Sequence, residues 1–181
     1  MTLSRPGLQR PLVLVAAGPA AAVIALQRHA GPPLASALGL PWCEPLVVRP
    51  PQQALAPLAQ QGPGLVPLPL DPGLPLPGVG HWAEALGAWR QPVVLLLAGA
   101  QLDSGLPAAM VALLHQWQVP LAGLVQWGGA WDGEARRGDG LPWLGWLAPD
   151  GSVPEGGEPD DAEPGQLARA LERRWRQIAD A

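Results

Sequence analysis

The sequence predicts a three-layer α/β domain, in which helices flank both faces of a mostly parallel sheet of about five strands. Two continuous apolar runs of strand length, residues 12–17 (LVLVAA) and 93–98 (VVLLLA), are typical of strands buried on both faces. The second run opens a strand–helix–strand unit over residues 93–127. Such a unit is almost always a right-handed crossover between parallel strands.

The composition favours a folded globular protein and argues against several classes of function. The 181 residues suffice for one domain with its own core, and 48% of them are hydrophobic. A formal net charge of -4 argues against nucleic acid as the main partner. Cys43 is the single cysteine, which excludes an intrachain disulfide and any multi-cysteine metal site. We expect its thiol to be inert and partly buried.

The N-terminal segment has two arginines before an apolar run, as a signal peptide does. However, Pro11 and the Gly18-Pro19 pair interrupt that run, which is also too short to span a bilayer. A first buried strand explains the segment better. We therefore expect a cytoplasmic protein without a membrane partner.

Short elements separated by proline and glycine are expected before residue 80. Pro19 suits the first position of a helix, where its missing N–H is tolerated. The LVPLPL run suits an edge strand or an extended loop, because Pro67 and Pro69 remove donors from a strand ladder. The expected elements are a helix at 20–29, a short helical segment within 31–45, a short strand at 46–48, a weak helix at 52–61, the edge strand at 65–70 and a loop with polyproline character at 71–80.

Clearer periodicity follows in the middle of the chain. A helix is expected at residues 81–90, where Trp82, Leu86 and Trp89 share one face at the spacing i, i+4, i+7. Ser104 is a good N-cap for the next helix. That helix has a single apolar stripe, formed by Leu106, Met110, Leu113, Leu114 and Trp117.

The C-terminal segments differ sharply in composition. Residues 149–163 carry six acidic residues and no basic residue, which is typical of a solvated linker. The helix that follows has leucines on one face and most of its arginines on the other, and we expect it to pack back on the domain. The boundaries are an α/β domain at 1–148, whose last strands lie at 121–127 and 143–148 around a polar loop at 128–141, the acidic linker at 149–163 and the C-terminal amphipathic helix at 164–181.

A family resemblance covers residues 92–147. This stretch contains, in order, VVLLLA, a capped amphipathic helix, VPLAGLVQWGG, an arginine-bearing loop and DGLPWLGWL. The order resembles the C-terminal half of dethiobiotin synthetases and, more broadly, the related P-loop ATPases, including cobyrinic acid amide synthetases and MinD-like proteins. In that group a strand of the form V-x-G-x-V-L-N precedes a loop and a strand ending in L-G-x-[LI]-P. The resemblance implies a P-loop NTPase-like fold.

The departures from that family concern its chemistry. Its phosphate-binding motif, G-x-x-x-x-G-K-[ST], should follow the first strand, but the sequence there is Gly18-Pro19 followed by AAAVI. The second glycine, the lysine and the hydroxyl are missing, and the whole chain has no lysine. Trp127 stands where the family has its adenine-reading asparagine. The resemblance thus implies a relative with a degenerate Walker A motif that has lost ATP hydrolysis. No cofactor is expected from the residues themselves; ATP and Mg²⁺ enter only through the resemblance.

The loop WGGAWDGEARRGDGLPW concentrates the side chains best suited to binding. It follows the carboxyl end of a predicted parallel strand, where open α/β sheets bind ligands. Its arginines could clamp a carboxylate or phosphate, its tryptophans could stack on a planar group, and its glycine pair would admit a close backbone approach. The candidate ligand- or partner-binding residues are Trp127, Gly128, Gly129, Trp131, Arg136, Arg137, Asp139 and Trp143, with Asp103 and Ser104 expected on the same rim.

Three interpretations of this loop are open. Arg136 or Arg137 could pair with Asp132 or Asp139, which would leave a self-satisfied loop whose tryptophans cover the end of the sheet. The same side chains could instead form a protein-binding surface or a small-molecule site. For Ser104, simple capping of the helix is the alternative to binding a ligand at the helix N-terminus.

No catalytic residue can be assigned from the sequence. The three histidines, His29, His81 and His115, show no metal-ligand spacing, and no serine lies in a G-x-S-x-G elbow. We therefore expect a non-catalytic relative of dethiobiotin synthetase-like ATPases that acts through protein contacts, as an assembly or regulatory factor with a protein partner or as a homodimer. The alternative is a ligase-like enzyme or binder that takes a small molecule or nucleotide at residues 126–146.

Overall fold

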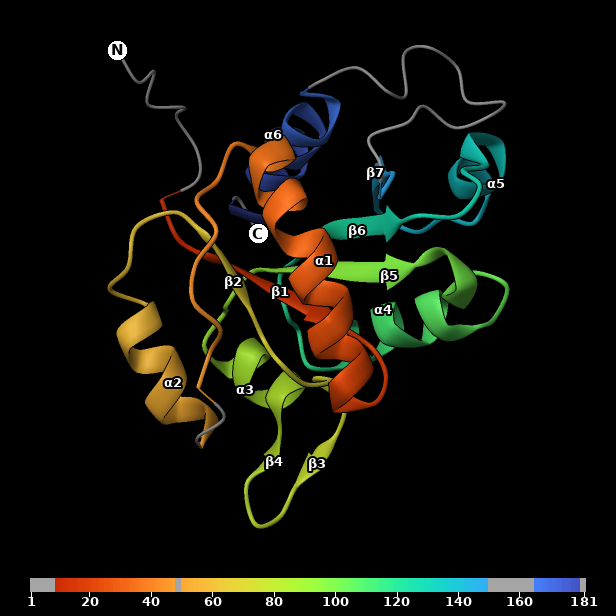
Figure 1. The fold of residues 1–181 in the computed structure, drawn as a ribbon. Helices are drawn as coiled ribbons and strands as arrows, with labels where there is room; N and C mark the ends of the chain where they lie inside the picture. The colour runs from red at the N-terminus through yellow and green to blue at the C-terminus, as the bar shows by residue number, and fades with distance from the viewer. Residues whose placement is uncertain (1–8, 48–49, 150–164, 180–181) are drawn as a thin grey trace, which may run out of the picture.

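A five-stranded parallel sheet forms the centre of the computed structural model, which describes residues 9–47, 50–149 and 165–179 (Figure 1). Helices cover both faces of the sheet, so the predicted three-layer α/β class is confirmed. The strands of the sheet, in chain order, are β1 (Leu12–Ala16), β2 (Leu65–Pro67), β5 (Val93–Ala98), β6 (Leu121–Trp127) and β7 (Trp143–Leu147).

The strands lie side by side in the order β2-β1-β5-β6-β7, and every neighbouring pair is parallel. This order is doubly wound. The chain moves from β1 outward to β2, then returns to the other side of β1 and continues through β5, β6 and β7. The direction therefore reverses between β1 and β5, and this reversal is the topological switch point of the sheet. The carboxyl ends of all five strands meet at one edge.

Two layers of helices pack on the two faces of the sheet, because side chains alternate between the faces along each strand. Leu12 and Leu14 belong to one buried cluster, and Val13 and Val15 belong to the other. All four side chains are fully buried, as the continuous apolar run predicts. The first cluster is covered by α1 (Ala20–Leu38) and α6 (Gln166–Ala179), and the second by α2 (Pro51–Leu58), α3 (Trp82–Ala88) and α4 (Leu106–Gln116).

α1 is longer than the sequence predicts. The expected break at Pro32 and Pro33 does not occur, so no separate helical segment follows residue 31, and the helix ends at Gly39 in the left-handed conformation (φ 69°). Both prolines are exposed, whereas Leu34 is fully buried against the sheet. The two missing backbone donors are thus offset by apolar burial on the other side of the helix, at about 1.5–3 kcal/mol for each leucine.

The strand predicted at 46–48 is wrong for its described residues, 46 and 47; residue 48 lies outside the described part. This segment is not part of a ladder but runs alongside β2, which is the edge strand that the sequence predicts. The backbone N–H of Cys43 donates to the Leu65 carbonyl at 3.0 Å, and that of Leu46 donates to Pro67 at 2.9 Å. Isolated hydrogen bonds of this kind cover the edge without forming a strand.

The loop expected at 71–80 contains a small β-hairpin instead of polyproline structure. Its strands, β3 (Pro75–Leu76) and β4 (Gly80–His81), are antiparallel and project from the domain next to α3 (Figure 1). Gly78 in the turn has a φ of 73°, a conformation that glycine adopts without strain. The sequence has no alternating pattern here, so hairpin pairing was not predictable from periodicity.

β5 and β6 coincide with the predicted strands, but two details between β5 and β7 differ from the prediction. The polar loop contains a short helix, α5 (Gly133–Gly138), which begins at Asp132; the Asp132 carboxylate accepts the N–H of Ala135 at 2.9 Å. Ser104 is not the N-cap of α4, because Gly105 takes that position. The Ser104 hydroxyl donates to the Gln101 carbonyl at 2.7 Å and accepts the N–H of Leu106 at 3.3 Å.

The C-terminal helix α6 packs on β6, β7 and α1 (Figure 1). Leu171 is fully buried in this contact, and Leu167 and Trp175 are nearly so. The helix begins at residue 166 in the structure; the linker predicted at 149–163 lies, from residue 150 onward, outside the described residues. In the part of the chain that the structure describes, none of the helices combines the length and the apolar character needed to cross a membrane.

Candidate functional site

The edge where the strands end is the usual ligand position in a doubly wound fold, and the chain brings four loops to it. Gly18 follows β1, Asp71 lies on the segment after β2, the 3-10 helix Gly99–Gln101 (η1) follows β5, and Gly128 follows β6. The contacts among these loops decide what this edge of the molecule can bind.

Asp71 satisfies the backbone where the family resemblance would place a phosphate-binding loop. Its carboxylate accepts hydrogen bonds of 2.8 Å from the N–H groups of both Gly18 and Gly73. Pro19, the next residue along, has no N–H to donate. A negative charge therefore already lies at the first turn of α1, where a phosphate would meet repulsion and would lose one of its donors. The geometry at Gly18 gives no support to nucleotide binding of the P-loop type.

The side chain of Gln101 links the ends of β1 and β5 at the topological switch point. Its side-chain oxygen accepts the N–H of Ala98 at 2.8 Å, and its side-chain nitrogen donates to the Ala17 carbonyl at 3.0 Å. The ends of two central strands thus bond to one side chain of the chain itself. Sequence reasoning missed this residue because a glutamine in a loop carries no pattern from which its partners can be read.

The glycines after β6 serve the chain's own packing. A Cβ atom on Gly99 would lie 2.6 Å from the Gly128 carbonyl oxygen and 2.9 Å from Cα of Gly129, so the loops after β5 and β6 touch through backbone. Gly128 and Gly129 also have positive φ angles of 66° and 71°. Beneath them lies the fully buried Gln126, whose amide nitrogen donates to the Gly128 carbonyl at 2.8 Å and to Ala130 at 2.9 Å.

Beyond this edge, α5 and β7 hold a connected group of Arg136, Asp139, Trp143 and Trp131. The Asp139 carboxylate lies 3.6 Å from the Arg136 guanidinium and accepts the indole N–H of Trp143 at 2.8 Å. The guanidinium carbon of Arg136 lies 5.1 Å from the centre of the Trp143 ring, within the range of a cation–π contact. Trp131 meets the same ring edge to face at 6.0 Å. These contacts match the self-satisfied arrangement that the sequence left open.

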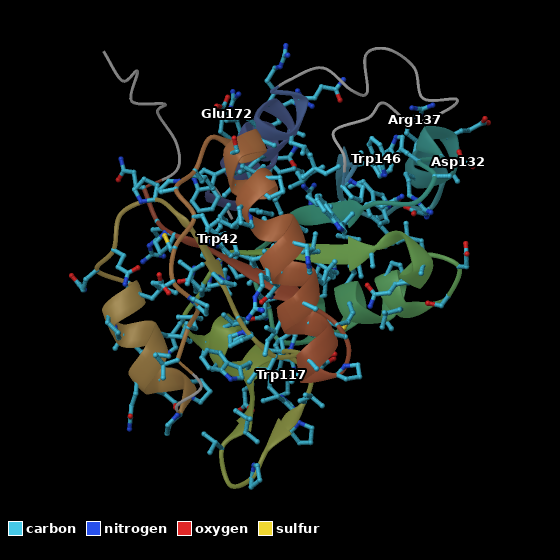
Figure 2. The ribbon with its side chains drawn as sticks, viewed as in Figure 1. Trp42, Trp117, Asp132, Arg137, Trp146 and Glu172 are labelled. Carbon is cyan, nitrogen blue, oxygen red and sulfur yellow. The ribbon has the colours of Figure 1, made fainter. Side chains whose placement is uncertain are left out.

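A groove opens beside this group, between α5, β7 and α6. Its volume is about 410 Å³, and three arginines, three tryptophans and no carboxylate are among the described residues that line it. We call it the Arg–Trp groove. Figure 2 shows Arg137 and Trp146 together at the α5 end of the domain. The lining residues are Trp131, Gly133, Arg136, Arg137, Leu141, Trp143, Leu144, Gly145, Trp146, Gln166 and Arg173.

The side chain of Arg136 lies mostly inside the wall of this groove. It is 18% exposed, and its Nε is buried without a hydrogen bond to any described residue. A buried donor without an acceptor costs about 1–3 kcal/mol. Arg137 and Arg173 are exposed and leave the groove positively charged on both its α5 side and its α6 side.

The structure places four of the predicted binding residues in the Arg–Trp groove. A fifth, Asp139, does not line the groove but holds two residues that do. Gly128 and Gly129 belong instead to the contact with Gly99. The four predicted residues in the groove are Trp131, Arg136, Arg137 and Trp143.

Trp127, Asp103 and Ser104 lie apart from the groove. Trp127 is half-buried and packs on the core cluster beneath α1 and α6, so its ring is part of the domain's packing. Asp103 and Ser104 are exposed on the turn before α4. None of the three is among the described residues that line the groove with the arginines.

Seven of the lining residues were not predicted, and three of them have polar groups in their side chains: Trp146, Gln166 and Arg173. The indole N–H of Trp146 reaches the carbonyls of Gly128 and Gly129 at 3.3 and 3.1 Å, which fixes the ring at the end of β7. The sequence could have indicated Trp146 only through its position in the short strand predicted to close the sheet. Arg173 comes from α6, and no local pattern indicates which strand that helix will cover.

Among the described residues at the groove, the guanidinium and indole groups are suited to binding, and the two nearby carboxylates are engaged in other contacts. Asp132 caps α5 and Asp139 is held by Arg136 and Trp143, so neither carboxylate is positioned as a free acid or base. Among the residues that the structure describes, no cluster of three or more His, Cys, Asp or Glu side chains could hold a metal ion. Guanidinium and indole groups recognise carboxylates, phosphates and planar or cationic groups.

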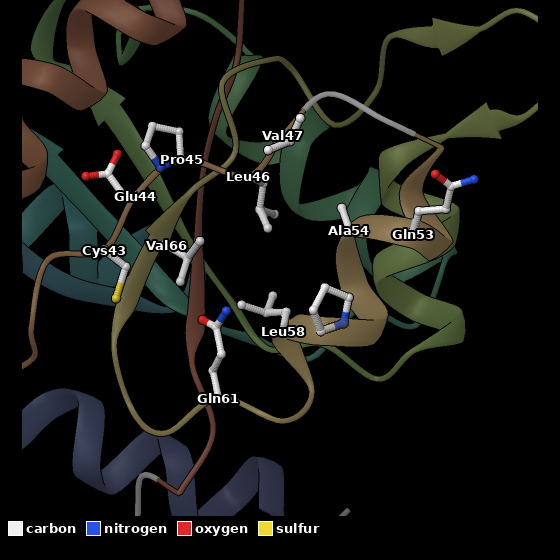
Figure 3. Close-up of a pocket in the computed structure, with 11 residues that line it drawn as sticks. Cys43, Glu44, Pro45, Leu46, Val47, Gln53, Ala54, Leu58, Gln61 and Val66 are labelled. Atoms are coloured by element: carbon white, nitrogen blue, oxygen red, sulfur yellow. The ribbon is translucent and has the colours of Figure 1, made fainter.

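A second cavity of about 400 Å³ lies between α2 and the segment that runs along β2 (Figure 3). Leu46, Leu58 and Val66 line its apolar side. Cys43, which is half-buried, and Gln61 lie on its polar side.

Comparison of the chain with protein-family models and with curated proteins gives no match. The resemblance to dethiobiotin synthetase-like ATPases therefore rests on the residues quoted above, together with the parallel three-layer fold.

Proposed function

We propose that this protein is a non-catalytic binding protein that recognises a protein partner through the Arg–Trp groove. It would act as an assembly or regulatory factor related to dethiobiotin synthetase-like P-loop ATPases. One observation carries the proposal: Arg136, Arg137 and Arg173 converge with three tryptophans on an open groove whose described lining has no carboxylate. Arginine and tryptophan are the side chains most enriched at the energetic centres of protein interfaces.

The state of the nucleotide positions supports a binding role over an ATPase role. The chain has no lysine, Pro19 stands within the would-be phosphate loop, and Asp71 holds the N–H of Gly18. Gln101 joins the ends of β1 and β5. The missing lysine and Pro19 remove donors that a P-loop enzyme uses for its nucleotide, and Asp71 and Gln101 engage the neighbouring backbone within the protein.

Affinity capture with matched charge variants tests the proposal. The full chain, its Arg137→Glu and Arg173→Glu variants and the control Arg176→Glu would be immobilised, and the captured proteins identified and their affinities measured with purified components. Arg173 and Arg176 are both exposed and lie three positions apart on α6, but only Arg173 lines the groove. We expect a partner held by the wild type and by Arg176→Glu and lost from the two groove variants. A partner that binds all four proteins equally would contradict the proposal.

A small-molecule role is the second candidate, and the size of the groove favours it. A volume of about 410 Å³ falls within the range of ligand pockets, roughly 300–1,000 Å³. The three indoles could stack on a planar group while an arginine binds its carboxylate or phosphate. A ligand of this kind would bind the purified chain without any protein partner and would change its tryptophan fluorescence.

A further inference from the structure

The open edge of β7 forms one side of the Arg–Trp groove. β7 is the last strand in the sheet order, and among the described residues only β6 pairs with it. Trp143, Leu144, Gly145 and Trp146 all line the groove. Successive side chains of a strand point to opposite faces, so a groove touched by four consecutive residues runs along the edge of the strand.

The backbone of β7 offers hydrogen-bonding groups to this groove. The N–H of Gly128 donates to the Leu147 carbonyl at 2.8 Å, which shows that the backbone of Leu147 faces β6. Because the groups alternate along a strand, the N–H and C=O of Trp146 face the other way, toward the groove. The N–H of Trp143 is held by the Leu141 carbonyl at 2.9 Å, which marks where the available edge begins.

The positive charges that line the groove indicate which kind of partner it can bind. The described lining carries the guanidinium groups of Arg136, Arg137 and Arg173 and no carboxylate, although the chain as a whole has a net charge of -4. A second copy joined edge to edge would bring two such sets of arginines together, which disfavours a homodimer at this surface. An acidic segment would pair with these arginines, and their positive charge would steer it to the groove.

We propose that the occupant of the Arg–Trp groove is an extended acidic segment of the partner, which adds as a further strand to the outer edge of β7. The inference rests on the proposed function and specifies its partner's chemistry. Main-chain hydrogen bonds to β7 supply part of the affinity, and alternate acidic side chains reach the arginines of α5 and α6. The tryptophans cover the aliphatic parts of the peptide.

Selection from a library of random ten-residue peptides tests this inference with a probe of defined chemistry. The full chain would be the bait, and the selected peptides would be synthesised with single backbone N-methyl groups at each position in turn. We expect Asp and Glu to be enriched at alternate positions. Each N-methyl group on a residue that bonds β7 should weaken binding roughly five- to tenfold, and groups at the intervening positions should have little effect. Arg137→Glu should abolish binding, and Arg176→Glu should leave it unchanged.

The outcomes separate this inference from the proposed function. Acidic peptides that bind through Arg137 but show no alternating N-methyl effect overturn strand addition and leave the proposed function standing. Selected peptides without acidic enrichment, or a single-stranded oligonucleotide that binds as tightly through the same arginines, overturn the inference. A variant with the acids of residues 149–163 changed to amides serves as the internal control. If peptides bind this variant alone, the chain's own segment is the occupant and the inference is wrong.

Discussion

The carboxylate of Asp71 accepts a 2.8 Å hydrogen bond from the backbone N–H of Gly18, across 53 positions of sequence. It thereby ties the end of β1 to the segment that follows β2. In a P-loop ATPase the corresponding backbone would point at a phosphate. Here the Asp71 carboxylate accepts the N–H of Gly18, so this backbone donor is engaged within the protein.

Replacing Asp71 by alanine should lower the free energy of unfolding by about 1.5–3 kcal/mol, because two backbone donors lose a charged acceptor. The measurement is the urea unfolding midpoint with its slope. Asp103→Ala is the matched control, since Asp103 is exposed and should change stability by less than about 0.5 kcal/mol. Equal effects for the two variants would mean that the Asp71 contact contributes nothing specific.

Gln101→Ala should cost about 1–3 kcal/mol, because the N–H of Ala98 and the carbonyl of Ala17 lose their partner together. Gln101→Glu separates the two bonds: its carboxylate can still accept from Ala98 but cannot donate to Ala17. We expect both variants to be destabilised in thermal unfolding. A glutamate variant as stable as the wild type would show that the bond to Ala17 has no weight.

Gly99→Ala should destabilise the fold by about 1–3 kcal/mol, because the added Cβ meets the backbone of the loop after β6, which cannot rotate away. Gly138→Ala is the control on α5, where an added Cβ meets no atom within 4 Å and alanine favours the helix. Chemical denaturation of both variants is the test. An unchanged midpoint for Gly99→Ala would refute the close contact with Gly128.

Titration of ATP, with and without Mg²⁺, should leave the tryptophan fluorescence of the protein without a saturable change. The reason is the combination of no lysine, Pro19 and the Asp71 contact. The variants Trp127→Phe and Arg136→Ala provide the counter-test. A saturable signal in the wild type that disappears in both would establish a nucleotide site at the loop and would contradict a purely protein-binding role.

Asp139→Asn should strengthen binding of acidic peptides to the Arg–Trp groove by roughly three- to tenfold. The substitution removes the negative charge that lies 3.6 Å from the Arg136 guanidinium and leaves that cation to the ligand. Isothermal titration with peptides selected on the wild type would measure the change. Glu134→Gln is the control, because Glu134 lies on α5, which Asp139 caps, and is not among the described residues that line the groove. Weaker binding by Asp139→Asn would mean that Asp139 positions Arg136 more than it neutralises it.

Only part of the predicted site lies in the groove. Residues that are close along the chain need not be close in the fold, and residues far apart along the chain can meet. The sequence located Arg136, Arg137 and Trp143 in one loop, since they are close along the chain. Arg173, on α6, joins them only because the helix packs on β7. Asp103 is the opposite case: it follows β5, the strand next to β6, but it is not among the described residues that line the groove.

What the sequence by itself determined is the fold class and most core elements. A continuous apolar run such as residues 93–98 would be unfavourable to expose to water on either face. Its burial on both faces can therefore be predicted from the sequence alone. Tertiary structure decided the strand order, the continuation of α1 through Pro32 and Pro33, and the Asp71–Gly18 contact. Each depends on contacts between residues far apart in the chain, and hydrophobic periodicity carries no information about them.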